Sequence, residues 1–501
     1  MQRSRYSWWL CFIGLLFILS AWNLSNPPGS GTDEGSSIVK ASATVRGQFI
    51  GTVVPNASWL GVKVYRVTVP NLYAQMFSQT SCASQSKLAH CPLPPNGKYL
   101  QSPETGTTYQ GNYPPFYFIL TGIPTLLPAS VPGSINLMRE MSILVECALI
   151  ASSITTLFNS RKNPYSLVGM FLALTPTAIS LFTNVNAMGL EIASATAVVV
   201  QSLTLVTEPS VPKRTVLRLC IASVVMVLSR PDSLLFYVVD LLPTLLLLNR
   251  SKFRHLIRLT QIKVWMGVSG SMLLLESAWQ IYAGPGLTPR KPILNYGSVL
   301  HRMILSYHNQ LDLISYEGLV GRFNNYFQNL SAPRLMYILW TAALLSFFLA
   351  GLFKIAIKDK LRVVVFFVVA LLALMSLEAY LIPSLGVFWQ GFNSLPVYIS
   401  LPIYIGFMID RSRKSTVAYE KYFQFTTLLI WLACISWSEI EIINWSASLH
   451  FIPLFRDPFI LALLALGVSL VLIFFIVMFF AAEKLDRPNN SEVLTPILVE
   501  P

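Results

Sequence analysis

Two adjacent carboxylates, Asp33 and Glu34, are the residues of this chain best placed to accept a proton. They follow the turn-rich stretch 26–31, which comes directly after a first apolar segment and so keeps them close to a membrane surface. A carboxylate in this place could take a proton from an attacking hydroxyl group. A structural alternative stays open, because Asp33 or Thr32 could instead be the N-cap of a helix over residues 38–47.

Other polar residues stand at the ends of apolar segments and could contact a substrate. The guanidinium of Arg139 can bind a phosphate through two hydrogen bonds, although a local pair with Glu140 or with an acidic loop residue is an equally good account. Ionisable groups inside a membrane normally face the protein interior, so Glu191 is either a buried acceptor or a substrate contact. Two nearby amides and the tyrosine of a Tyr-Pro-Pro motif are further candidates: Asn184, Asn186 and Tyr113.

The elements that position these residues are helices in a membrane. Hydrophobic residues make up 54% of the 501 residues and charged residues only 12%. This charged share is roughly half that of a soluble globular chain, so the composition excludes a water-soluble protein. Apolar runs long enough to cross a bilayer predict an all-α polytopic membrane protein with about twelve transmembrane helices. The stretch 116–127 follows a Pro-Pro pair and predicts an interfacial or re-entrant helix. The expected spans are 7–22, 135–158, 165–183, 187–207, 215–229, 231–248, 264–283, 334–353, 363–382, 395–409, 423–437 and 458–481.

The basic residues that give the net charge of +13 are concentrated in alternate loops. Arg3 and Arg5 place the amino terminus inside, and every second short connection is basic, which is the positive-inside pattern. Both termini are therefore predicted to be cytoplasmic. Contact with anionic membrane lipid explains the basic loops better than a polyanion-binding surface does, and no nucleic-acid partner is expected.

This topology divides the chain into spans, two long loops and a tail. Residues 1–22 are expected to be a signal-anchor span, with a cleaved signal peptide as the alternative. Two extracytoplasmic loops are predicted, the first with interfacial helices, and long loops on a rigid scaffold are where binding and catalysis are usually found. The second loop contains His301, Arg302, His308 and Arg322, which either close over an acceptor or simply face solvent. The loops are 23–134 and 284–333, the bundles 135–283 and 334–482, and the cytoplasmic tail 483–501.

The first loop contains Cys82 and Cys91, whereas the other four cysteines fall in apolar runs. A cysteine pair in an oxidising exterior predicts a disulfide bond. His90 would add a third donor for a metal, but the sequence offers no further Cys or His nearby, so metal binding is the weaker alternative. Signatures of ATP-driven and zinc-peptidase chemistry are missing from the sequence.

Several motifs carry a resemblance that extends over most of the chain. They are Pro27-Pro28-Gly29-Ser30 with Asp33-Glu34 and Lys40-Ala41, Tyr113-Pro114-Pro115, Leu174-Thr175-Pro176, the stretch 184–191, and Trp389-Gln390-Gly391 with Leu395-Pro396. In order and spacing they resemble a bacterial family of predicted membrane proteins, the family of unknown function numbered 2142, whose loop cysteines also resemble Cys82 and Cys91. That family in turn resembles the GT-C superfamily of membrane glycosyltransferases, which use polyprenyl-phosphate sugars and keep an acidic residue in the first outer loop.

Two positions depart from the family pattern. Ser37 stands where the family usually has a histidine, three residues after the Asp-Glu pair. Phe392 stands where it has an arginine after Gln-Gly. These departures keep a non-catalytic homologue open as an alternative.

The resemblance implies a GT-C-like glycosyltransferase in the bacterial plasma membrane. It would move a sugar from a polyprenyl-phosphate donor to a cell-envelope glycan or protein acceptor on the outer face, with Asp33 as base and Glu34 as its substitute or partner. A lipid phosphate can leave without a general acid, so cations suffice. The candidates for the donor phosphate are Lys40, Arg139, Arg230 and Arg302.

The substrate pocket expected from this reading consists of Tyr113, Asn184, Asn186, Glu191 and Gln390. A bound divalent metal is possible, but it has no spacing signature in the sequence. A lipid or solute transporter is the competing class, because many spans with charged residues would also suit a carrier. A non-catalytic envelope-assembly protein is the third.

Overall fold

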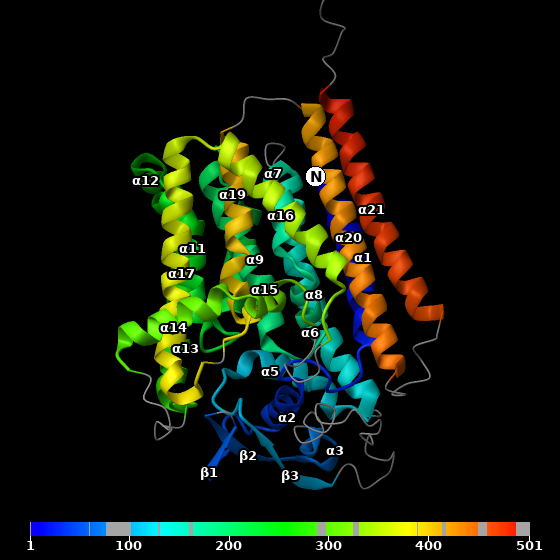
Figure 1. Cartoon of the computed structure of the whole chain (residues 1–501), viewed down its shortest axis with the longest axis vertical. Helices are drawn as coiled ribbons and strands as arrows, with labels where there is room; N and C mark the ends of the chain where they lie inside the picture. Colours follow the sequence, from blue (N-terminus) through cyan, green and yellow to red (C-terminus); the bar gives the residue numbers. More distant parts are fainter. Residues whose placement is uncertain are drawn as a thin grey trace, which may run out of the picture.

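The fold is a bundle of long helices with a small β-sheet at one end, which we call the sheet end (Figure 1). The computed structural model describes residues 2–59, 61–76, 102–128, 131–159, 164–287, 297–323, 330–387, 389–412, 417–448 and 458–486. Helices occupy every segment in which a span was predicted. They are α1 (Gln2–Ser25), α6 (Val131–Asn159), α7 (Pro164–Ala173) with α8 (Pro176–Phe182), α9 (Ala187–Thr207), α10 (Lys213–Val227), α11 (Ser233–Leu247), α13 (Thr260–Ala283), α16 (Arg334–Lys354), α17 (Ile357–Leu385), α19 (Ser400–Arg411), α20 (Val417–Ser448) and α21 (Pro458–Asp486).

The number of membrane spans is smaller than the twelve expected. Within the described ranges, eight helices are long and apolar enough to cross a bilayer, or up to ten if each of two bent pairs is one span. Helix α10 has 15 residues, whereas a crossing needs about 20. Helix α13 has 24 residues, but Lys263, Glu276 and Gln280 interrupt its apolar surface. The chain is thus a mostly helical membrane protein with eight to ten candidate spans.

The two bent pairs have different causes. Helices α7 and α8 meet at 66°, where Pro176 lacks an N–H and excludes Thr175 from the helical conformation. The hydroxyl of Thr175 instead caps α8 by accepting from the Ala178 N–H at 3.2 Å. Helix α11 turns by 118° into the basic helix α12 (Arg250–Arg258), which lies across the end of the bundle opposite the sheet.

Helix α9 lies at the centre of the bundle. Every residue of α9 from Ala187 to Leu205 is buried, because α6, α8, α10, α11 and α19 surround it. Helix α1 packs against the last helix, α21, where Gly14 and Gly467 allow a close approach: a Cβ on Gly467 would lie 2.8 Å from the Gly14 carbonyl oxygen. By contrast, α16 and α17 expose many leucine, valine and phenylalanine side chains, as expected of helices that face lipid.

The expectation of an all-α fold is wrong for the first long loop. Strands β1 (Thr52–Trp59), β2 (Val62–Pro70) and β3 (Pro103–Thr108) form an antiparallel sheet in the order β1-β2-β3. The valines at 62, 64, 67 and 69 show why, since β-branched residues at near-regular spacing favour a half-buried strand. The helix α2 (Glu34–Thr44), with every residue buried, lies between this sheet and the helix α5 (Pro115–Gly122).

The remaining elements lie towards the sheet end. A short apolar helix is present where an interfacial helix was predicted, and it consists of α5 followed by η2. The second long loop contains two helices rather than an irregular connection. These elements are α3 (Asn71–Ala74), η2 (Ile123–Leu126), α14 (Val299–Leu311), α15 (Leu313–Val320), η3 (Gly391–Ser394) and α18 (Leu395–Tyr398).

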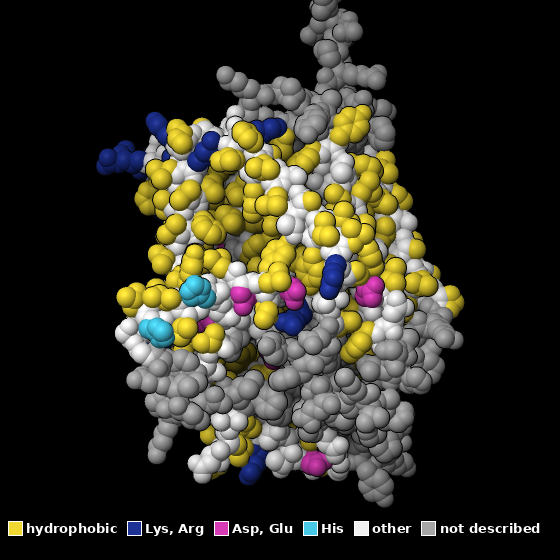
Figure 2. Space-filling view, in the orientation of Figure 1, with side chains coloured by type: hydrophobic (Ala, Val, Ile, Leu, Met, Phe, Trp, Pro, Cys, Tyr) yellow, Lys and Arg dark blue, Asp and Glu magenta, His cyan; other side chains and the backbone are white. Residues whose placement is uncertain are grey.

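Basic side chains gather at the end of the bundle opposite the sheet. Helix α12 and the turn from α16 to α17 lie there (Figure 1), and Figure 2 shows lysine and arginine side chains at that end. Helix α1 begins and α21 ends on the same side. If residues 23–134 and 284–333 lie outside, as the basic loops predict, the sheet end lies outside too; this topology stays a prediction.

Candidate functional site

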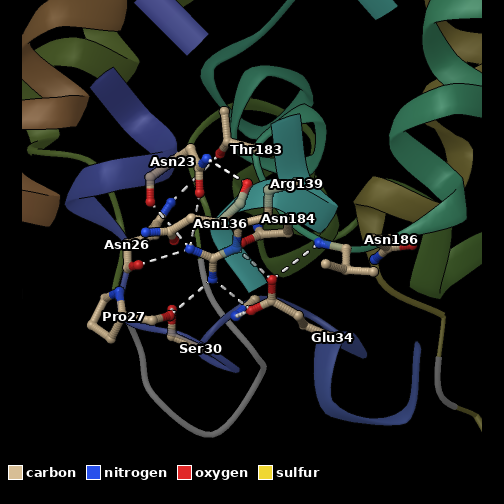
Figure 3. Close-up of polar contacts among 12 residues, drawn as sticks. Asn23, Asn26, Pro27, Ser30, Glu34, Asn136, Arg139, Thr183, Asn184 and Asn186 are labelled. Carbon is tan, nitrogen blue, oxygen red and sulfur yellow. Dashed lines mark hydrogen bonds and ion pairs between the residues drawn. The ribbon is translucent and has the colours of Figure 1, made fainter. Parts of the chain in front are cut away.

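The chain that leaves α1 is held against the bundle by Arg139 of α6 (Figure 3). Its guanidinium forms a two-point ion pair with Glu34, with Nε 2.6 Å from Oε1 and Nη2 2.7 Å from Oε2. The other N–H groups donate to the carbonyl oxygens of Asn23, Asn26 and Pro27 at 3.1, 2.8 and 2.9 Å. Both charged side chains are fully buried. All five guanidinium donors are therefore used inside the protein.

This pair bears on two expected roles. A phosphate contact by Arg139 would require the pair to break, and Glu34 has both oxygens occupied, so neither residue enters the site we assign below. The partner of Arg139 is a loop carboxylate and not Glu140, which accepts from Asn23 Nδ2 at 2.7 Å and from Ser20 Oγ at 2.9 Å.

The stretch between α8 and α9 fixes the residues on both sides of Asp33. The Val185 N–H donates to Glu34 Oε1 at 3.0 Å, and the Asn186 amide donates to the Thr32 carbonyl at 2.8 Å. Asn186 Oδ1 also caps α9 by accepting from Met188 N. Asn184 packs against Gly31, where a Cβ would lie 2.3 Å from the Asn184 side chain. The two amides, predicted as substrate contacts, here position the loop that carries Asp33.

Asp33 has a left-handed backbone conformation, which is uncommon for residues other than glycine. It stands at the N-cap position of α2 with φ of 60° and ψ of 3°, and its side chain makes no capping hydrogen bond. Its Oδ1 instead accepts from the Tyr109 hydroxyl at 2.5 Å. A left-handed non-glycine residue costs about 1–3 kcal/mol and is common at functional sites. The side chain of Asp33 therefore does not cap α2, unlike in the N-cap alternative.

The pKa of Asp33 is raised, because burial disfavours the carboxylate. The hydrogen bond from Tyr109 and the charge of Arg230 oppose this shift without cancelling it. Burial also raises the pKa of Tyr109 well above its ordinary value, so its hydroxyl keeps its proton and acts as a donor. The Asp33 carboxylate is therefore more basic than an ordinary aspartate. The residue is partly exposed.

Arg230, between α10 and α11, is near enough for its positive charge to lower the pKa of Asp33. Its Nη1 lies 3.4 Å from Glu191 Oε2 and its Nη2 lies 3.1 Å from Asp232 Oδ2. Glu191 is also held by the Ser233 hydroxyl at 2.5 Å. The Nε of Arg230 is buried and has no hydrogen-bond partner within the described part of the chain. One donor of this guanidinium is thus available to an anion.

Tyr113 completes the group from the side of the first loop. Burial raises its pKa to about 12, while Arg230 acts in the opposite direction. Of the expected residues, the fold therefore brings together Asp33, Tyr113, Glu191 and Arg230. Sequence reasoning did not assign Tyr109, which stands four residues before Tyr113, or Asp232, which stands two residues after Arg230.

Lys40 is buried in the sheet end. Its Nζ donates to the carbonyl oxygens of Gly111, at 2.7 Å, and Phe49, and it lies 5.8 Å from the centroid of the Phe118 ring. Burial lowers the pKa of Lys40 to about 7. Its contacts join α2 to both ends of the sheet segment, so the expected phosphate contact would again need existing bonds to break.

Arg302 lies beside a second polar group, and its side chain donates to the Ala379 carbonyl at 3.3 Å. This group surrounds Glu378 of α17, which is buried and accepts three side-chain hydrogen bonds from α14. Gln390 directly precedes η3 and follows Trp389, whose carbonyl accepts from Asn309 Nδ2 at 3.2 Å. Arg302 is therefore part of a different polar group from the one around Asp33 and Arg230.

Two expectations concern metals and cysteines. Among the residues that the structure describes, no group of three or more His, Cys, Asp or Glu side chains could hold a metal ion. Cys82, Cys91 and His90 lie outside the described residues. Ser37 and Phe392, which replace family residues, are both buried, and Ser37 donates to Gln110 at 2.8 Å.

The chain is similar to a known protein family and to solved structures. No curated protein matches the chain. The crystal structure of ArnT from Cupriavidus metallidurans bound to undecaprenyl phosphate is 14% identical, with 96% of this chain and 78% of that chain covered and a TM-score of 0.42. The apo structure of the same protein is 12% identical, with 97% and 78% covered and a TM-score of 0.39. The family model described as "Predicted membrane protein (DUF2142)" matches residues 16–391.

Proposed function

The chain belongs to the DUF2142 family of predicted membrane proteins, and we propose that it is a membrane glycosyltransferase. It moves a sugar from a polyprenyl-phosphate donor to a hydroxyl of a cell-envelope glycan or protein, on the side of the membrane where the sheet lies. The observation that carries this proposal is Asp33, which is strained, does not cap its helix and lies close to Arg230. The donor class comes from the family resemblance.

In the proposed reaction, Asp33 accepts the proton of the acceptor hydroxyl. The oxygen of that hydroxyl attacks the anomeric carbon of the sugar, and a new C–O bond forms. The bond between the anomeric carbon and the phosphate oxygen breaks, and its electron pair leaves with the lipid phosphate. Atoms and charge balance, because the negative charge of Asp33 is replaced by that of the phosphate.

Arg230 is the residue we assign to the leaving phosphate. Its Nε is a buried donor with no hydrogen-bond partner among the described residues, and an unpaired buried donor is costly unless a ligand occupies it. Glu191 and Asp232 hold the other two nitrogens in place, so the guanidinium is oriented before the substrate binds. A preorganised donor contributes more to catalysis than a mobile one, because it needs no rearrangement as charge develops.

The test compares two identical substitutions at two different aspartates. Asp33→Asn keeps size and removes basicity, so transfer from a polyprenyl-phosphate sugar should fall by roughly 10²–10⁴-fold. Asp312→Asn is the control, because Asp312 is a true N-cap that accepts from Ser315 N at 2.6 Å, and asparagine caps equally well. Wild-type transfer by Asp33→Asn would overturn the role of the base. A wild-type protein that transfers no sugar from any polyprenyl phosphate would overturn the function.

A transporter is the second candidate, and buried carboxyl groups in the bundle favour it. Glu146, Asp240 and Glu439 are buried, and each has one oxygen without a hydrogen-bond partner among the described residues. Ionisable groups inside a membrane often mark a proton path. Proteoliposomes with an imposed pH gradient would show proton-driven uptake of a solute by a transporter, and the Asp33→Asn variant would then keep that activity.

A further inference from the structure

Helix α14 runs across the transmembrane helices instead of along them (Figure 1). With α15 it forms the segment 299–320, which we call the strap. Sequence reasoning placed this region in a water-exposed loop. The two faces of α14 differ sharply in polarity, and their orientation decides which environment the strap occupies.

The polar face of α14 is turned towards the protein. Glu378 of α17 accepts from Ser306 Oγ at 2.6 Å and from Asn309 Nδ2 at 2.6 Å. Gln310 donates to the same carboxylate at 3.2 Å, and its own oxygen accepts from Ser394 Oγ at 3.0 Å. These residues recur at intervals of three and four, so they share one side of the helix. The strap is therefore attached through its polar groups.

The opposite face is uncovered and mostly apolar, with His301 and His308 exposed along one edge. Leu300 is 69% exposed and Leu311 is 56% exposed, and Ile304 and Tyr307 between them are also exposed. The apolar surface continues into α15 through Leu313 and Ile314. A helix packed on a water-soluble protein shows the reverse arrangement, with its apolar side inside.

The position of Glu378 along α17 gives the depth of the strap. Helix α17 begins at Ile357, at the end opposite the sheet. Its first turns carry Lys358, Asp359, Lys360 and Arg362, so its apolar run begins at Val363. From Val363 to Glu378 the helix rises by about 23 Å at ~1.5 Å per residue, which is less than the ~30 Å thickness of a bilayer core. Glu378 therefore lies in the outer part of the hydrocarbon region, and the outer face of α14 lies at the same level.

The far end of the strap and the residues that follow it are fixed to α8. Thr175 Oγ1 donates to the Leu319 carbonyl at 2.7 Å, and Ser180 Oγ donates to the Phe323 carbonyl at 2.9 Å. With α17 on one side and α8 on the other, the strap keeps its apolar face outward. That face adjoins the exposed apolar faces of α16 and α17, and Figure 2 shows hydrophobic side chains over this region.

We propose that the strap docks on membrane lipid, with Leu300, Ile304, Tyr307 and Leu311 inserted among acyl chains at the sheet end of the bundle. Lipid is the occupant, because the exposed face is continuous with membrane-spanning helices and lies at the depth of the outer part of the bilayer. The proposal does not depend on the proposed function. It assigns the second long loop a membrane contact in place of a contact with solvent.

The test places the photoreactive residue p-benzoylphenylalanine at single positions of the full-length chain in bilayer nanodiscs of phosphatidylethanolamine and phosphatidylglycerol. The test positions are Leu300 and Leu311 of the strap. Leu345 of α16 is the lipid-facing control and Ser58 of β1 is the water-facing control; both control sites are exposed. After irradiation, mass spectrometry counts lipid adducts.

The strap positions should give lipid adducts within about twofold of those at Leu345 and at least tenfold above those at Ser58. Adducts at Leu300 and Leu311 no more frequent than at Ser58 would overturn the proposal. Crosslinks from these positions to a second copy of the chain in place of lipid would also overturn it. Elution of each variant at the wild-type volume on gel filtration checks that it is folded, and no variant alters Asp33 or Arg230.

Discussion

The ion pair between Glu34 and Arg139 should be one of the main interactions that hold the first loop on the bundle. We expect Glu34→Gln to destabilise the protein by about 3–5 kcal/mol, the usual cost of leaving a buried charge without its partner. The surroundings explain why the amide is a poor replacement. The two oxygens of Glu34 accept from Arg139 twice, from Val185 N and from Gly31 N. Whichever way the glutamine is turned, its NH₂ group faces donors.

The double substitution Glu34→Leu with Arg139→Met separates the charge from the packing. It removes both charges, so its cost should be less than the sum of the two single substitutions, with a coupling energy of about 1–3 kcal/mol. It does not restore wild-type stability, because the carbonyl oxygens of Asn23, Asn26 and Pro27 lose their donor.

The assay is thermal unfolding of the detergent-solubilised protein, followed by tryptophan fluorescence. A loss of 1 kcal/mol lowers Tm by about 2–4 °C in domains of 150–250 residues, so Glu34→Gln should lower it by several degrees. Glu140→Gln is the matched control, because this neighbouring carboxylate accepts from the neutral groups of Asn23 and Ser20. If Glu34→Gln lowered Tm no more than Glu140→Gln, the assignment of the buried pair as a main attachment would be refuted.

Two further predictions concern pH. Transfer should rise with pH as Asp33 ionises. The midpoint of this rise should lie above the ordinary aspartate pKa of ~3.9, because burial raises the pKa of the Asp33 carboxyl. The hydrogen bond from Tyr109 lowers that pKa, so Tyr109→Phe should move the midpoint to higher pH. A midpoint that Tyr109→Phe leaves unchanged would contradict the assignment. Burial lowers the pKa of Lys40 to about 7 in the folded protein, whereas the pKa of an unfolded lysine is ~10.4. Between these two pH values the unfolded state binds more protons than the folded state. The free energy of unfolding should therefore rise with pH across this range. Lys40→Met should remove this rise in Tm, whereas Lys63→Met, at a lysine whose Nζ donates to the Pro285 carbonyl, should keep it.

The sequence by itself determined the membrane class, the positions of the helices and the family. Runs of apolar residues place helices reliably, because a helix in lipid must satisfy its backbone internally whatever surrounds it. The motifs also singled out Asp33, Tyr113, Glu191 and Arg230, which the fold then brings together. The number of spans was overestimated, since the segment 215–229 was counted as a crossing although its helix α10 has only 15 residues, against 21 in α9.

Only the tertiary structure decided which charges are free and which are consumed. Arg139 and Glu34 are 105 positions apart, so no local pattern shows that they satisfy each other, whereas the Arg230 Nε has no partner in the part of the chain that the structure describes. The left-handed conformation of Asp33 and the outward apolar face of α14 are equally invisible in the sequence. Periodicity reveals that a helix has two faces, but the side that meets lipid, water or protein depends on the neighbours that long-range packing places around it.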